Sequence, residues 1–294
     1  MYEPEPKFEK YVDVVLSAWR HAADLPALLY QLKATLAAAM VAYLSITLAL
    51  WLVRSGGMLK ALGFVAEVAG LGVAGLLLAA GAVAVNLRAL GKESGAGETM
   101  LYIERSVPAL VQCCGAFYAA FALVLCLLLV PTAAARLGLL GQMAYALLLL
   151  PITALAAAGV LALVAGIALV PAELALNGRD TGETFRNLQT TMWSQARSLL
   201  TTFAVAVTAS AAIALPILAV LSAANACLGA SVLLVGGISL RPVPSLLAGL
   251  SSVAVIAVAA APPLVCLNSV VALRYREMSD AARRPPQSAD QAEV

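Results

Sequence analysis

The run MAYALLLLPITALAAAGVLALVAGIALV, residues 143–170, contains no charged side chain. It is long enough to cross the hydrocarbon core of a bilayer as a helix, which takes about 20 residues. Hydrocarbon offers backbone groups no hydrogen-bond partner, so a helix that satisfies its own groups is the expected form. A barrel strand would alternate apolar and polar residues, whereas LALVAGIALV within this run is apolar on every face. The run therefore predicts a transmembrane helix.

The rest of the chain has the same character. Apolar residues make up 62% of it and charged residues 12%, against about 25% charged in an ordinary soluble domain. Its mean hydropathy is +0.94. Six segments qualify as spans, and they are residues 34–53, 61–87, 107–130, 143–170, 199–221 and 246–273. The sequence predicts an all-α fold, a polytopic membrane helix bundle with six transmembrane helices over residues 34–273.

The distribution of charge predicts the orientation of these spans. If the N-terminus is cytoplasmic, fourteen of the eighteen Lys and Arg residues fall in cytoplasmic segments, as the positive-inside rule requires. The outer connections hold only Arg54, Lys60, Arg136 and Arg241. We therefore expect both termini to be cytoplasmic. Because the Ala-rich composition is typical of bacteria, we expect the chain to lie in a bacterial inner (plasma) membrane.

A polar stretch, NGRDTGETFRNLQTTMWSQARS at residues 177–198, separates the fourth and fifth spans. Asp180 and Glu183 have the spacing of a capping box, which predicts a helix start. An apolar stripe follows at intervals of three and four, formed by Phe185, Leu188, Met192, Ala196 and Leu199. We expect an amphipathic helix along the lipid headgroups, with Trp193 at the depth where indole rings settle.

The cytoplasmic loop before the third span has a similar pattern. GETM at residues 97–100 matches GETF at 182–185, and an apolar stripe follows both. We interpret this as an internal duplication of residues 61–130 and 143–221, with an elbow helix in each unit.

The two ends of the chain are predicted to lie outside the bilayer core. Residues 1–33 contain an amphipathic helix, which either anchors the chain on the membrane surface or docks a partner protein. Asp24, with Pro26 just inside, predicts the start of the helix that leads into the first span. Residues 274–294 are polar and predicted to be a disordered cytoplasmic tail. The outer connection at residues 222–245 is predicted to form a helix at the outer surface.

Glu67 is the acidic residue within the predicted spans, and an intramembrane carboxylate is a functional candidate. It lies about two turns from the outer end of its span, where it can reach headgroups or water or bond a neighbouring helix, so a structural role also explains it. Gly70, Leu71 and Ala74 share its side, which we expect to face another helix. At the inner face, Arg88, Arg179 and Arg186 could bind a lipid phosphate, although orientation alone also accounts for them.

Enzymatic chemistry has little support in the sequence. His21 is the single histidine, and the five cysteines stand in apolar context without metal-ligand spacing. There is no phosphate-binding loop or dinucleotide fingerprint. We expect no catalytic site, no cofactor and no metal. The net charge of +2 does not favour a nucleic-acid partner.

The segment VPAELALNGRDTGETFRNLQTTMWSQARSLL, together with NSVVALRYREM near the end of the chain, resembles a group of bacterial integral membrane families. These are the YciC, DUF975 and DUF4013 families, which include the membrane domain fused to some glycerophosphodiester phosphodiesterases. The similarity covers residues 60–277 and is a pattern of a span, a polar turn and an elbow helix. It implies a six-helix domain without known catalytic residues.

Two functions remain open. The first is a non-enzymatic structural role, as a membrane scaffold or a subunit of a larger complex, with a homo-oligomer or other membrane proteins as partners. The second is transport or lipid handling, suggested by the duplicated hairpins, the prolines within three spans and Glu67. The spans have little polar lining, so membrane lipid is the more compatible ligand.

Overall fold

The structure, a computed structural model, describes residues 8–92, 95–134, 138–178, 180–235 and 242–283. In these ranges the chain is helical and contains no strand, which confirms the predicted all-α class. The helices are α1 (Phe8–Ala22), α2 (Leu25–Ser55), α3 (Leu59–Ala89), α4 (Ala96–Ala134), α5 (Leu139–Asn177), α6 (Thr181–Ser194), α7 (Ala196–Val235) and α8 (Pro242–Arg283).

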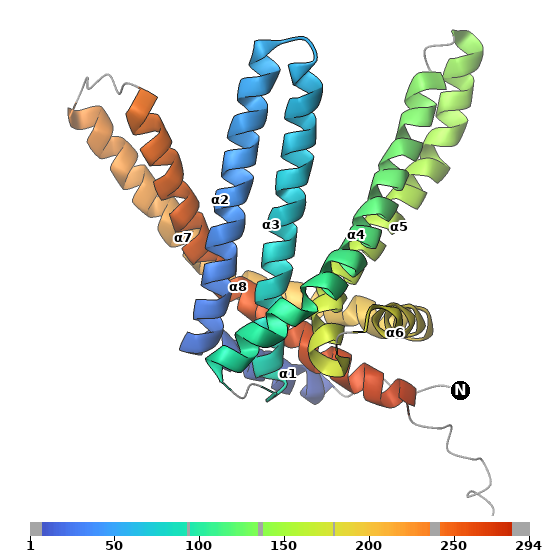
Figure 1. The fold of residues 1–294 in the computed structure, drawn as a ribbon, viewed down its shortest axis with the longest axis vertical. Helices are drawn as coiled ribbons and strands as arrows, with labels where there is room; N and C mark the ends of the chain where they lie inside the picture. Colours follow the sequence, from blue (N-terminus) through green and yellow to red (C-terminus); the bar gives the residue numbers. More distant parts are fainter. Residues whose placement is uncertain (1–7, 93–94, 135–137, 179, 236–241, 284–294) are drawn as a thin grey trace, which may run out of the picture.

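Three long hairpins, α2–α3, α4–α5 and α7–α8, spread from a common base (Figure 1). Their tips lie at one end of the molecule. The helices α1 and α6 and the end of α8 lie at the other end, which we call the base. Each of the six predicted apolar segments lies within one of the six long helices.

Within the residues that the structure describes, four helical segments are long and apolar enough to cross a membrane. They are Leu25–Ser55, Leu59–Ala89, Ala196–Leu221 and Ser252–Ala281. Two shorter apolar segments, Gly141–Ala157 and Ala168–Asn177, belong to α5. The described chain therefore has the features of a multi-pass membrane protein.

Glycines bring α2 and α3 together along their length. A Cβ atom added at Gly70 would lie 2.1 Å from the Cβ of Ser45, and one at Gly81 would lie 2.4 Å from the Cβ of Ala34. The hairpin turns at Gly56, whose φ of +82° is a conformation that favours glycine. Gly70 packs against α2 and Ala74 is buried, whereas Leu71 is 46% exposed, so the predicted side of α3 faces another helix at its small residues only.

The packed core sits at the base, around the second half of α8. This helix contacts α1, α2, α3, α5, α6 and α7. Its fully buried side chains include Val265, Val270 and Tyr275. Toward the tips, large apolar side chains stay uncovered, among them Leu44, Trp51, Phe64, Leu150 and Leu215. The hairpins are therefore joined at one end only.

Several helices extend beyond their predicted ends. The predicted disordered tail is wrong for residues 274–283, because α8 continues to Arg283 and buries Tyr275 and Met278. Residues 284–294 lie outside the described residues. The predicted helix at the outer surface is instead a continuation of α7 to Val235. Similarly, α5 runs through Pro171 to Asn177.

The polar stretch before α7 forms the predicted helix, α6. Asp180 caps it, accepting hydrogen bonds from the backbone N–H groups of Gly182 at 2.8 Å and Glu183 at 3.4 Å. The helix ends at Gln195, where the backbone leaves helical geometry (φ −129°, ψ 30°). In contrast, the GETM segment forms the first turns of α4 without a break.

The hairpins do not coincide with the predicted duplicated units. Residues 61–130 cover α3 and most of α4, and residues 143–221 cover most of α5 and much of α7. Each unit therefore joins helices from two different hairpins. The duplication stays a prediction.

Candidate functional site

The predicted site residues do not come together. Glu67 and Arg88 lie on the same helix, α3, about 30 Å apart along its axis. Glu67 is half-buried in the tip half of the hairpin, whereas Arg88 is at the base. Arg186 is exposed on α6, and Arg179 lies outside the described residues. No single site can therefore contain both Glu67 and Arg88.

Arg88 has a protein partner at the base. Its Nε donates to Oδ2 of Asp24, and its Nη2 donates to Oδ1 at 3.2 Å. This hydrogen-bonded guanidinium lowers the pKa of the Asp24 carboxyl, and its charge adds to the effect. The pair joins the start of α2 to the end of α3. A lipid phosphate at Arg88 would have to share the guanidinium with Asp24.

Glu173 is a buried carboxylate that the sequence reasoning missed. It lies near the end of α5 with 1% of its surface exposed. Oε2 accepts from Nδ2 of Asn177 at 2.7 Å, and Oε1 accepts from Nδ2 of Asn187 at 2.7 Å. Because Asn187 is on α6, this carboxylate clamps α5 to α6. The spacing of four residues between Glu173 and Asn177 is a helical signal, but the predicted span ends at residue 170, just before Pro171.

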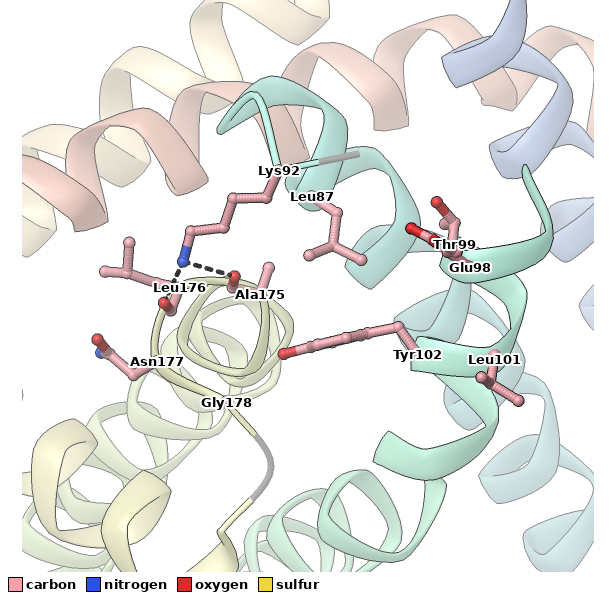
Figure 2. Close-up of a pocket in the computed structure, with 10 residues that line it drawn as sticks. All are labelled: Leu87, Lys92, Glu98, Thr99, Leu101, Tyr102, Ala175, Leu176, Asn177 and Gly178. Carbon is pink, nitrogen blue, oxygen red and sulfur yellow. Dashed lines mark hydrogen bonds between the residues drawn. The ribbon is translucent and has the colours of Figure 1, made fainter. Parts of the chain in front are cut away.

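Two side chains from other elements cap the C-terminal end of α5 (Figure 2). The Tyr102 hydroxyl, on α4, donates to the carbonyl of Leu174. Lys92, which follows α3, donates from Nζ to the carbonyls of Ala175, at 3.4 Å, and Leu176. The last carbonyls of a helix lack partners within it, and the negative end of the helix dipole favours a cation there. These contacts fix the ends of three hairpin helices to one another.

Beside these contacts lies a pocket of about 580 Å³. Three elements supply its lining, namely the end of α3 with Lys92, the first turns of α4, and the last residues of α5. The lining includes Leu87, Lys92, Glu98, Leu101, Tyr102 and Leu176. The volume is within the range of about 300–1,000 Å³ that is usual for small-molecule sites.

A second polar cluster fixes α1 to the base. Arg274 on α8 is buried and forms an ion pair with Glu277. Its Nη2 donates to the Tyr11 hydroxyl at 3.3 Å, and its guanidinium carbon lies 4.6 Å from the centroid of the Tyr11 ring. The N-terminal amphipathic helix therefore docks on its own chain.

A polar contact also links α2 and α8 in the interior. Nδ2 of Asn268 donates to Oε1 of Gln31 at 3.3 Å, and both side chains are buried. Asn268 therefore forms an interhelical hydrogen bond. Asn86 is fully buried on α3, and neither its Nδ2 nor its Oδ1 has a hydrogen-bond partner in the described chain.

The polar groups described at the base form hydrogen bonds and ion pairs between helices. Within the described residues, no group of three or more His, Cys, Asp or Glu side chains could hold a metal ion. Cys113, Cys114 and Cys266 are buried, as expected for small core residues. No family model, no curated protein and no solved structure matches this chain.

Proposed function

We propose that this chain is a non-enzymatic scaffold or complex subunit of a bacterial inner membrane, with six transmembrane helices and both termini in the cytoplasm. The observation that carries the proposal is the contrast between the packed base and the uncovered tips of the hairpins. Polar contacts fix the base, whereas large apolar side chains of all three hairpins remain exposed toward the tips.

Lipid and partner helices are the two kinds of neighbour for such surfaces. Helix association in a bilayer depends on close van der Waals packing, which small residues permit. The described hairpins are rich in alanine and glycine, and Gly72 on α3 has open space around it. The splayed hairpins therefore offer long apolar sides to the helices of a second membrane protein or a second copy of the chain.

The position of the charged residues supports the proposed orientation. Arg54 lies at the tip end of α2, whereas Arg88, Lys92, Arg186 and Arg276 lie at the base. With the base on the cytoplasmic side, most cationic side chains stay inside, as the positive-inside rule predicts.

The test is the mass of the protein extracted from membranes in a mild detergent. A scaffold or subunit is expected to run as a particle heavier than one 30.1 kDa chain plus detergent. Replacing Leu147 and Leu150, both exposed on α5, with Trp should reduce that mass. The matched control is Met100→Trp, at an exposed position of the base. A monomer that copurifies with nothing would refute the proposal.

Transport or lipid translocation is the second proposal, and Glu67 supports it. This carboxylate is half-buried in the tip half of α3, and no described residue forms a hydrogen bond or an ion pair with it. Burying an acidic side chain at such a depth costs free energy, so a residue of this kind is a functional candidate. Glu67→Gln should then change flux or ligand binding in proteoliposomes. A change in stability alone would refute this second proposal.

A further inference from the structure

The pocket at the end of α5 is lined by both charged and apolar side chains. Among its ten described lining residues, Lys92 carries the positive charge and Glu98 the negative charge. Leu87, Leu101 and Leu176 contribute apolar surface. A ligand that fills this pocket would therefore combine both charges with an apolar part.

Lys92 has an N–H donor that no described acceptor uses. An ammonium group has three N–H donors, and two of them are used on the carbonyls of Ala175 and Leu176. In the described chain no third acceptor lies within hydrogen-bond distance of Nζ. Burial lowers the pKa of Lys92, and the charge of Arg276 adds to this, while Glu173 raises it. An anionic group beside Nζ would offset that desolvation.

Glu98 supplies the opposite charge. It is exposed in the first turns of α4, and its carboxylate forms no hydrogen bond or ion pair with any described residue. The two charged groups reach the pocket from different elements, α4 and the segment after α3. This arrangement is complementary to a zwitterion and not to an anion alone.

The depth of the pocket agrees with a lipid headgroup. The apolar span of α3 ends at Ala89, and the apolar part of α5 ends at Asn177. Both ends border the pocket, so it lies where a membrane helix meets the headgroup layer. Leu87, at the buried end of α3, contributes to the apolar lining.

We propose that this pocket binds a phosphoethanolamine group, with the phosphate on Lys92 and the primary ammonium on Glu98. Lysine binds phosphate as a point charge, and a primary ammonium can donate hydrogen bonds to a carboxylate. A choline headgroup has no N–H to donate. A headgroup with negative charge alone would be repelled by Glu98. The depth favours an inner-leaflet phospholipid over a soluble ligand as the source of this group.

The experiment uses the full chain in nanodiscs of phosphatidylcholine that contain a fraction of phosphatidylethanolamine or phosphatidylglycerol. Mass spectrometry measures which lipid is retained. The wild-type chain is expected to enrich phosphatidylethanolamine over phosphatidylcholine by about ten-fold or more, the effect of one charge-assisted hydrogen bond. Lys92→Gln should abolish the enrichment, but it also removes a cap from α5.

Glu98→Gln is therefore the decisive variant. This variant should no longer enrich phosphatidylethanolamine and should retain more phosphatidylglycerol than the wild type. A purely structural role of Glu98 would not cause such a change in lipid selectivity. Glu104→Gln, exposed further along α4 and outside the pocket lining, should bind like the wild type. Retention of the preference in Glu98→Gln, or its absence in the wild type, would overturn the proposal.

A competition experiment distinguishes a membrane phospholipid from a soluble compound as the source of the phosphoethanolamine group. Soluble glycerophosphoethanolamine should compete only weakly, because it lacks the acyl chains. Competition at the same concentration as the lipid would overturn the lipid source in favour of a soluble one.

The site rests on the proposed position of the chain in the membrane. A chain found outside the membrane fraction would refute that position, whereas an embedded chain without a headgroup preference would refute the site alone.

Discussion

Glu173 is the side chain whose replacement the base should tolerate least. Its two oxygens accept from Asn177 and Asn187, and the group is almost fully buried. Burying an unpaired polar group costs more free energy than a paired one contributes. The contact also joins α5 to α6, so its loss affects two elements at once.

We predict that Glu173→Leu lowers the free energy of unfolding by about 1–3 kcal/mol, because both amide groups lose their acceptor. Glu173→Gln should cost less, since Gln keeps an acceptor oxygen and either Asn can turn its own oxygen toward the new amide. Thermal unfolding in detergent measures both variants. Glu104→Gln, exposed on α4, is the control and should leave the midpoint unchanged. Equal midpoints for Glu173→Leu and the wild type would contradict the clamp.

The pair of Asp24 and Arg88 predicts a dependence on pH. Arg88 lowers the pKa of Asp24 in the folded state below the value of about 3.9 in the unfolded state. The carboxylate therefore stabilises the fold at every pH above about 4, and this contribution is lost as the pH falls through the folded pKa. We predict that Asp24→Asn lowers the free energy of unfolding by up to about 1 kcal/mol at pH 7, since the pair is partly exposed.

The difference between Asp24→Asn and the wild type should narrow only below about pH 4. Melting curves of both proteins from neutral to acidic pH would measure this. A difference that disappears already at pH 6, or is absent at pH 7, would mean that the pair does not stabilise the junction of α2 and α3.

At the scale of helices, close approach and capping determine stability. The seam of α2 and α3 depends on glycines that leave no room for a side chain. The amphipathic helix α6 depends on the Asp180 cap at its start. Both α3 and α6 contact α8, so the seam and the cap also support the packing around α8.

Gly70→Ala should disturb the seam, because its Cβ would lie 2.1 Å from the Cβ of Ser45. We predict a loss of about 1–3 kcal/mol in unfolding free energy, the usual cost of overpacking. Gly72→Ala is a matched control two residues away, with nothing within 4 Å of the added Cβ. It should be neutral or stabilising by up to about 1 kcal/mol, since Ala favours helix more than Gly. Equal effects of the two variants would argue against the close packing.

Asp180→Ala should weaken the start of α6 by about 1 kcal/mol, because two backbone N–H groups lose their acceptor. Hydrogen exchange of the α6 amides should then rise about five-fold. Asp180→Asn keeps a good capping side chain and should exchange nearly like the wild type. Unchanged exchange in Asp180→Ala would show that tertiary contacts alone hold the helix.

Periodicity and apolar length predict the helices well, because both are properties of consecutive residues. The cap at Asp180 and the small side of α3 were predicted for the same reason. The site at the base was not predicted. Lys92, Tyr102 and Asn187 come from elements other than α5, and nothing in a linear sequence brings them to its C-terminal end. Ends of spans were also misjudged, because a proline such as Pro171 is compatible with a continuing helix.

At the scale of the whole molecule, the tips and the base form two ends with different chemistry. The base holds the buried polar clusters, whereas large apolar side chains are exposed toward the tips. An arrangement of six spans with cytoplasmic termini places the whole base in one compartment and the three tips in the other.

Arg54 and Arg186 test this arrangement, because they are exposed at opposite ends of the structure. Each is replaced with Cys in a chain whose native cysteines are changed to Ala, and intact cells are labelled with a membrane-impermeant thiol reagent. The cysteine at position 54 should react in intact cells, and the one at position 186 only after the membrane is opened. The physical reason is that a charged reagent cannot cross the hydrocarbon core. Labelling of both positions in intact cells would mean that the tips and the base share a compartment, and the proposed topology would then fail.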